Sequence, residues 1–311
     1  MIAKEQTASV RPDMSVEIAG VTLKNPVMTA SGTFGSGMEY SEFVDLDCLG
    51  AVVTKGVANK PWEGNPTPRV AEVYGGMLNA IGLQNPGIDV FIERDLAFLS
   101  QFDTKIIVNV CGHTEEEYLE VVERLSDQPV DMLEINVSCP NVKQGAIQFG
   151  QDPKCLLDIT EKIKRKAAQP VIMKLTPNVT DIAEMARAAE AGGADAISMI
   201  NTITGMKIDI EKRQFVLANK TGGLSGPAIR PVAVRMVWQA AQAVKIPIIG
   251  MGGIASYEDA VEFMLAGAAA VAVGAMNFHD PYLTKKVIDG MEQYLIRHSI
   301  GSARELTGAV R

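Results

Sequence analysis

Residues 247–276, PIIGMGGIASYEDAVEFMLAGAAAVAVGAM, contain two strand-like runs with a helical segment between them. The runs PIIGMGG (247–253) and AAVAVGAM (269–276) are continuously apolar, as in parallel strands that are buried on both faces. Ser256, with Asp259 three residues later, is typical of a helix start. A helix is also predicted by the apolar stripe at Tyr257, Ala260, Val261 and Met264. Strand, helix and strand in this order indicate an α/β fold.

The same unit recurs through the chain. Six further apolar runs are VMTASG (27–32), AVVTKG (51–56), IIVNV (106–110), MLEINVS (132–138), VIMKLT (171–176) and AISMIN (196–201). Helical stripes occur at Tyr118, Val121, Val122 and Leu125, at Ile182, Met185, Ala186 and Ala189, and at Val234, Val237, Trp238 and Ala241. Eight strands alternating with helices predict an eight-stranded parallel (β/α)8 barrel, the TIM-barrel architecture of the α/β class. An open doubly wound sheet is the alternative, but such sheets rarely need eight evenly recurring units.

Three intervals between strands carry extra chain, and each insertion follows a strand: 57–88, 139–152 and 202–229. Insertions after strands lie on the C-terminal face of a barrel, where barrel enzymes keep their chemistry. They are rich in Gly, Asn and Pro, which predicts shaped loops rather than extra domains. We therefore expect one domain over residues 1–311.

Composition excludes several classes of protein. Of 311 residues, 37 are acidic and 29 basic, so the net charge of −8 argues against a nucleic-acid-coating surface. No apolar stretch approaches the length that spans a bilayer, and the N-terminus lacks the apolar run of a signal peptide. Four cysteines without CxxC spacing and three scattered histidines encode neither a metal site nor an iron–sulfur cluster. A cytoplasmic protein that binds no membrane is expected.

The last two strands end in glycine, at Gly252-Gly253 and at Gly274-Ala275. Loops after strands seven and eight of a barrel commonly bind phosphate, since exposed backbone N–H groups and a helix N-terminus face the anion. Gly226 in the third insertion could add a further close backbone contact. The alternative is that these glycines only make tight turns. The pattern indicates a phosphorylated ligand without identifying it.

Polar side chains interrupt the strand ends. Lys55 and Lys174 each stand in an otherwise apolar run, so each should meet an anion, an acceptor or water at the barrel mouth. The alternative is that they reach solvent. Amides that suit a flat heterocycle with C=O and N–H groups are Asn79, Asn109, Asn136, Asn141 and Asn201. Any single one could instead be a turn or cap residue.

Cys139 lies three residues beyond Asn136, on a loop above the predicted mouth. Positively charged neighbours could lower the pKa of its thiol and make it a base or a nucleophile. The alternative is an incidental loop thiol. Cys48 precedes the second strand, Cys155 falls in a predicted helix, and Cys111 lacks the neighbouring amides, so these three are weaker candidates.

A set of motifs resembles the FMN-containing dihydroorotate dehydrogenases over residues from about 15 to the C-terminus. The motifs are GNPTPRV (64–70), NAIGLQNPG (79–87), NVSCPNV (136–142), KLTPN (174–178), NTITGM (201–206), GGLSGPAIRP (222–231) and GMGGI (250–254). GTFGSGMEY (32–40) resembles the class 1B catalytic subunit, which works with NAD+. The membrane class, with its N-terminal extension and serine base, does not fit. The fumarate-linked class 1A, which also uses cysteine, remains the nearest alternative.

The resemblance implies a role for each matching residue. Cys139 is implied as the catalytic base. FMN contacts are implied at Ser31, Lys55, Gly56, Asn109, Asn136, Lys174, Ile200, Gly226, Gly252, Gly253, Gly274 and Ala275. Substrate contacts are implied at Lys55, Asn79, Ala80, Ile81, Gly82, Leu83, Asn136, Asn141, Asn201 and Thr202.

The implied activity is oxidation of (S)-dihydroorotate to orotate in pyrimidine (UMP) synthesis, with one FMN per chain. The implied partner is a subunit that carries FAD and a [2Fe–2S] cluster and passes electrons to NAD+, within a heterotetramer built on a dimer of catalytic chains. Two other functions stay open from the residues alone. One is a flavin-free barrel enzyme acting on a sugar phosphate, and the other is a non-catalytic flavin-binding subunit.

Overall fold

The structure, a computed structural model, describes residues 11–137 and 149–310. Eight parallel strands close into a barrel in chain order, as the sequence predicts. They are β3 (Val27–Thr29), β4 (Ala51–Val53), β7 (Lys105–Val110), β8 (Met132–Asn136), β9 (Val171–Lys174), β10 (Ala196–Met199), β15 (Ile248–Met251) and β16 (Ala270–Val273). The closed order excludes the open doubly wound sheet.

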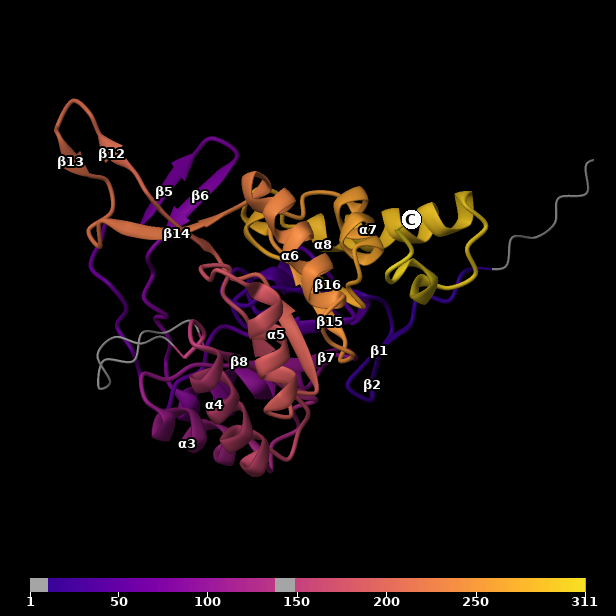
Figure 1. Cartoon of the computed structure of the whole chain (residues 1–311), viewed down its shortest axis with the longest axis horizontal. Helices are drawn as coiled ribbons and strands as arrows, with labels where there is room; N and C mark the ends of the chain where they lie inside the picture. Colours follow the sequence, from indigo (N-terminus) through magenta and orange to yellow (C-terminus); the bar gives the residue numbers. More distant parts are fainter. Residues whose placement is uncertain (1–10, 138–148, 311) are drawn as a thin grey trace, which may run out of the picture.

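Helices surround the barrel (Figure 1). They are α1 (Ile88–Val90) and α2 (Ala97–Leu99) joined by a π-helical turn (Phe91–Leu96), α3 (Glu115–Leu125), α4 (Pro153–Lys166), α5 (Ile182–Ala191), α6 (Arg230–Ala241), α7 (Tyr257–Leu265) and α8 (Leu283–Arg297). Between β3 and β4 the chain forms only two short 3₁₀ turns, Tyr40–Glu42 and Leu46–Cys48. The predicted start of α7 is confirmed, because Ser256 accepts from the N–H of Asp259. Asp181 caps α5 in the same way and accepts from the N–H of Ala183.

The predicted stripes of α3 and α5 are confirmed, since all of their apolar residues are buried. In α7, Ala260, Val261 and Met264 are buried. The stripe predicted for α6 is wrong by one residue. The residues of α6 that face the barrel are Ala233, Met236, Val237 and Ala240. Trp238 is 47% exposed and lines an outer groove with Val261 and Tyr294. Since one residue turns a helix by about 100°, two adjacent apolar stripes cannot be told apart by period alone.

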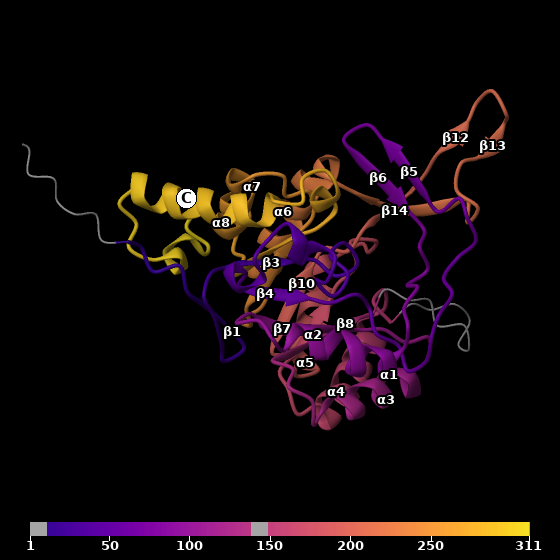
Figure 2. The same cartoon turned by 180° about the vertical axis from the view of Figure 1, so that it is seen from behind.

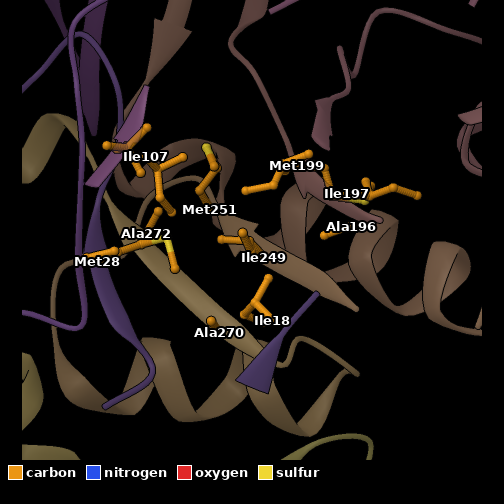
Figure 3. Packing of buried hydrophobic residues seen from close by; sticks show 14 of the residues in the cluster. Ile18, Met28, Ile107, Ala196, Ile197, Met199, Ile249, Met251, Ala270 and Ala272 are labelled. Carbon is orange, nitrogen blue, oxygen red and sulfur yellow. The ribbon is translucent and has the colours of Figure 1, made fainter. Parts of the chain in front are cut away.

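A two-stranded hairpin closes the N-terminal end of the barrel. Strands β1 (Val16–Ile18) and β2 (Val21–Leu23) pair through Ala19-Gly20, where both residues have positive φ, as a two-residue hairpin requires. Ile18 is fully buried in the main apolar cluster and points toward Ala270 and Ile249 at the starts of β16 and β15 (Figure 3). This end is therefore packed shut.

The opposite end carries the long insertions, which are more regular than shaped loops. Strands β5 (Val70–Val73) and β6 (Gly76–Asn79) follow β4, while β11 (Ile203–Met206) and β14 (Thr221–Ser225) follow β10. They form one antiparallel sheet in the order β11-β14-β6-β5. With the hairpin β12 (Ile208–Asp209) and β13 (Gln214–Phe215), this sheet extends beyond the barrel in both views (Figures 1 and 2). Two insertions far apart in the chain thus form one structure at the C-terminal face.

Candidate active site

The C-terminal ends of three neighbouring strands supply buried polar side chains. Asn109 is the penultimate residue of β7, Asn136 is the last of β8 and Lys174 is the last of β9, and all three are buried. Asn136 stands opposite Lys174 in the register of β8 and β9. Because the strands are parallel, these predicted residues meet at one end of the barrel.

A carboxylate that the sequence analysis did not single out joins them. Glu134 of β8 accepts hydrogen bonds from Asn109 Nδ2 at 2.7 Å and Ser198 Oγ at 2.7 Å. Lys174 Nζ lies 3.4 Å from Glu134 Oε1 and donates to Ser31 Oγ at 2.8 Å. The signal was available, since Glu134 interrupts an apolar strand as Lys55 and Lys174 do.

Lys55 follows β4 by two residues and is half-buried. Its backbone N–H donates to Gly35 O at 2.8 Å. A Cβ on Gly32 would lie 3.8 Å from Lys55 Nζ, which places the ammonium beside the loop that follows β3. Burial lowers the pKa of Lys55 below its usual 10.5, with Arg69 adding to the shift and Cys111 opposing it. Lys55 is thus a cation that an anionic ligand would stabilise.

Cys111 is closer to this site than the sequence analysis expected. A Cβ on Gly56 would lie 3.2 Å from Asn109 Oδ1 and 3.3 Å from Cys111 Sγ. Cys111 is fully buried and packs with Trp62 and Leu83. Gly56, Asn109 and Cys111 therefore come together, although only the first two were predicted site residues.

Asn79 in β6 and Asn201, two residues after β10, each form a side-chain hydrogen bond at this end of the barrel. Asn201 Nδ2 donates to Asn136 Oδ1 at 3.3 Å, and the N–H of Thr202 donates to Asn201 Oδ1 at 2.8 Å. Asn79 Nδ2 donates to Gly223 O at 3.4 Å. A Cβ on Gly223 would collide with the Thr202 hydroxyl at 2.0 Å, so Asn79 and Thr202 border the same glycine.

The segment from Ala80 to Leu83 is held by Asn65, which comes from the GNPTPRV motif. The N–H of Asn65 donates to Ile81 O at 2.9 Å, and its Nδ2 donates to Ala80 O at 3.0 Å. Gly82 has a φ of +75°, and a Cβ there would lie 2.7 Å from the Asn65 nitrogen. Only glycine fits this turn, which continues directly from Asn79.

The predicted phosphate loops also come together. Gly253 has a φ of +79°, and a Cβ on it would lie 2.6 Å from Gly226 O, so the two backbones touch. A Cβ on Gly252 would lie 3.4 Å from Ile200 Cγ1. At Gly274 a Cβ would meet only Ala30 Cβ, at 3.5 Å, within 4 Å. The open space beside Gly274 and the start of α7 after Gly253 suit a phosphate group.

Cys139 and Asn141 lie outside the described residues. Cys48 precedes β4 and Cys155 lies in α4, where the sequence placed them. Within residues 11–137 and 149–310, no group of three or more His, Cys, Asp or Glu side chains could hold a metal ion. Nor is any helix in those ranges long and apolar enough to cross a membrane.

A closed eight-stranded α/β barrel with lysines and amides gathered at the carboxyl ends of its strands has the architecture of the barrel enzymes. The chain belongs to the dihydroorotate dehydrogenase family, whose sequence model matches residues 13–295.

Curated relatives extend over nearly the whole chain. Proteins named dihydroorotate dehydrogenase B (NAD(+)), catalytic subunit, are 68% identical in Lachnoclostridium phytofermentans and 62% identical in Alkaliphilus oremlandii. Each match covers 96% of this chain and 99% of the relative. A solved structure of DHODH from Eimeria tenella in complex with ferulenol has a TM-score of 0.80 at 24% identity. It covers 99% of this chain and 91% of that one, and at this identity the likeness concerns the fold alone.

Proposed function

We propose that this chain is the catalytic subunit of an NAD+-linked dihydroorotate dehydrogenase, which oxidises (S)-dihydroorotate to orotate in pyrimidine synthesis. The observation that carries the proposal is the meeting of Lys174, Asn136 and Asn201 at the barrel mouth, beside the glycine turns. Family membership argues against a sugar-phosphate enzyme. The names of the 68% and 62% identical relatives favour catalysis over a non-catalytic role, and NAD+ over fumarate as the final acceptor.

One FMN per chain is proposed for the mouth of the barrel, with residues 1–311 forming a single FMN-binding domain. When bound, FMN supplies a hydride acceptor, which no side chain provides. Gly226, Gly252, Gly253, Gly274 and Ala275 would hold its phosphate, because glycine and alanine have little or no side chain to keep an anion away from the backbone N–H groups. The residues proposed to contact the rest of the cofactor are Ser31, Lys55, Gly56, Asn109, Asn136, Lys174 and Ile200.

The buried donor set fits such a ring. Among the described residues, Lys174 directs one of its three ammonium protons to Ser31 and one to Glu134. The third proton could then be donated to a bound ring. Its side chain is 5% exposed, so its charge acts in a medium of low dielectric constant. Lys174 would therefore stabilise negative charge that develops beside it during the reaction.

The amides orient the substrate. Asn79, Asn136, Asn141, Asn201 and Thr202 carry the kinds of donors and acceptors that would match the C=O and N–H groups of a pyrimidine ring. Lys55 would pair with the anionic substrate. Because burial lowers its pKa, an anionic partner would stabilise the charged form of Lys55. The segment Ala80, Ile81, Gly82, Leu83, which continues from Asn79, would supply further substrate contacts.

Removal of hydrogen from dihydroorotate takes a proton from C5 and a hydride from C6. We assign the proton to Cys139, since a proton next to a carbonyl needs a base held over one face of the substrate. In sequence, Cys139 follows Asn136, the last residue of β8, by three positions.

Electrons must then leave the chain. The four cysteines have no cluster spacing and the sequence has no nicotinamide-binding fingerprint. We propose that a partner subunit with FAD and a [2Fe–2S] cluster relays them to NAD+, in a heterotetramer built on two catalytic chains.

The test uses the purified chain alone and the chain co-expressed with its partner. We expect a flavin absorption band that dihydroorotate bleaches anaerobically in both samples. NAD+ should support turnover only with the partner. A colourless active protein would refute the FMN site, absence of bleaching would refute the activity, and efficient fumarate reduction by the isolated chain would move it to class 1A.

A further inference from the structure

Glu134 is an anion buried inside the barrel. Its side chain is 2% exposed, and both of its carboxylate oxygens are engaged. Oε1 accepts from Asn109 Nδ2 and faces Lys174 Nζ, while Oε2 accepts from Ser198 Oγ. These partners come from β7, β9 and β10, so one side chain of β8 contacts three other barrel strands.

Glu134 lies one step below the mouth. It is two residues before Asn136 on β8, so both side chains point to the same face of the strand. In register it stands opposite Asn109 and Ile172, whereas Asn136 stands opposite Lys174. The carboxylate is therefore level with Asn109 and one step below Asn136 and Lys174, and it contacts Asn109 and Lys174 through hydrogen bonds.

A buried ion pair is a costly way to fill a barrel. Replacement of such pairs by apolar side chains of similar volume is often neutral or stabilising, so the pair is weak evidence for stability. Elsewhere the interior of the barrel is filled by apolar side chains, such as those of Ile107, Met28 and Ala272, which point inward (Figure 3). Glu134 instead contacts Asn109 and Lys174, two residues that are predicted to contact the cofactor.

We propose that Glu134 is a positioning residue that holds Lys174 and Asn109 where they would contact FMN and offsets the positive charge of Lys174 there. This inference rests on the proposed function. Without the carboxylate, Lys174 would contribute an uncompensated positive charge to the proposed site and would favour flavin reduction strongly. The carboxylate 3.4 Å from that ammonium offsets the charge. A flavin with a lower potential passes electrons onward to a weak oxidant such as NAD+ more readily.

The test is Glu134→Gln, measured as the midpoint potential of the bound FMN. Glutamine has the same shape, its carbonyl can face Asn109 and Lys174, and its amide can donate to Ser198 Oγ. Loss of one negative charge should raise the potential. At a fixed dye potential the ratio of reduced to oxidised flavin should rise at least about tenfold, which is about 30 mV for a two-electron couple.

Two matched variants separate charge from packing. Ser198→Ala removes the hydrogen bond to Oε2 without a change of charge and should leave the potential near that of the parent. Glu134→Asp keeps the charge but shortens the side chain, so its potential should stay near the parent value while FMN binds more weakly. With the partner present, Glu134→Gln should slow NAD+ reduction more than it slows bleaching by dihydroorotate.

The outcomes are distinct. The proposal is overturned if the midpoint potential of FMN in Glu134→Gln equals that of the parent. It is also overturned if Ser198→Ala raises this potential as much as Glu134→Gln does. If Glu134→Gln does not retain FMN, the comparison moves to Glu134→Asp, and unaltered FMN affinity there overturns the positioning role. Failure of the parent to bind FMN or to be bleached would instead refute the proposed function.

Discussion

Asp259 in the first turn of α7 forms an ion pair with Arg230 at the start of α6. The other oxygen of the Asp259 carboxylate accepts a hydrogen bond from the N–H of Ala255 at 2.8 Å. A Cβ on Gly253 would lie 3.0 Å from Arg230 Cβ. The pair therefore holds the turn after β15 against the segment that follows β14, on the side where we place the phosphate.

Asp259→Asn should loosen this turn. We expect the free energy of unfolding to fall by about 1–2 kcal/mol, because Asp259 is nearly buried but Arg230 is one-third exposed. FMN affinity should fall by about tenfold, which corresponds to about 1.4 kcal/mol. Denaturant titration and FMN titration of the apoprotein measure the two effects. Glu262→Gln is the control, since Glu262 faces the same arginine at 3.4 Å but is half-exposed. Equal losses in both variants would contradict the role of Asp259.

Gly253→Ala should abolish tight FMN binding, because the added Cβ would lie 2.6 Å from Gly226 O on a backbone with a φ of +79°. Gly20→Ala is a matched control, since Gly20 has a φ of +81° but no atom within 4 Å of an added Cβ. The control should lose only about 1 kcal/mol of stability and bind FMN like the parent. Thermal unfolding and flavin content measure this. The close approach of the two glycines would be irrelevant to binding if Gly253→Ala retained its flavin.

Lys55→Met tests the cation in the site through pH. Burial lowers the folded-state pKa of Lys55, so the unfolded chain binds more protons and the charged lysine destabilises the apoprotein at neutral pH. The penalty is fully present below the lowered pKa and disappears as pH rises to the usual value of 10.5. The apoprotein of Lys55→Met should therefore be more stable than the parent near pH 7, with the difference narrowing toward about pH 10. Urea titrations across this range measure it, with the exposed Lys60→Met as the control. A difference independent of pH would exclude a buried charge at Lys55.

Cys139→Ala should bind FMN normally but slow flavin reduction by dihydroorotate by roughly 10²–10⁴, the usual contribution of a general base. Cys139→Ser should keep some activity, shifted to higher pH, because a hydroxyl is a poorer base than a thiol with an ordinary pKa of about 8.5. Orotate affinity should change little. Stopped-flow bleaching over about pH 6–10 measures these rates. The base assignment fails if Cys139→Ala stays within about threefold of the parent over this range.

Several features were already determined by local sequence. Continuous apolar runs mark all eight barrel strands, because parallel strands covered on both faces need apolar side chains on both. All the predicted runs except IIVNV (106–110), which ends with β7 at Val110, extend past their strands toward the mouth, as at Lys55 after β4. Helix starts at Asp181 and Ser256 were equally readable, since capping depends on residues only three apart.

The tertiary structure decided what local pattern leaves open. The face of α6 that packs on the barrel is one residue away from the predicted stripe, because helix period cannot choose between two apolar stripes. Cys111 lies against Gly56, and Glu134 joins Lys174 to Asn109, only because neighbouring strands align in a particular register. The pairing of β6 with β14 brings Asn79 to Gly223, 144 residues further along the chain. A short window of sequence determines which segments become strands, but their partners depend on closure of the whole barrel, which brings distant segments to one mouth.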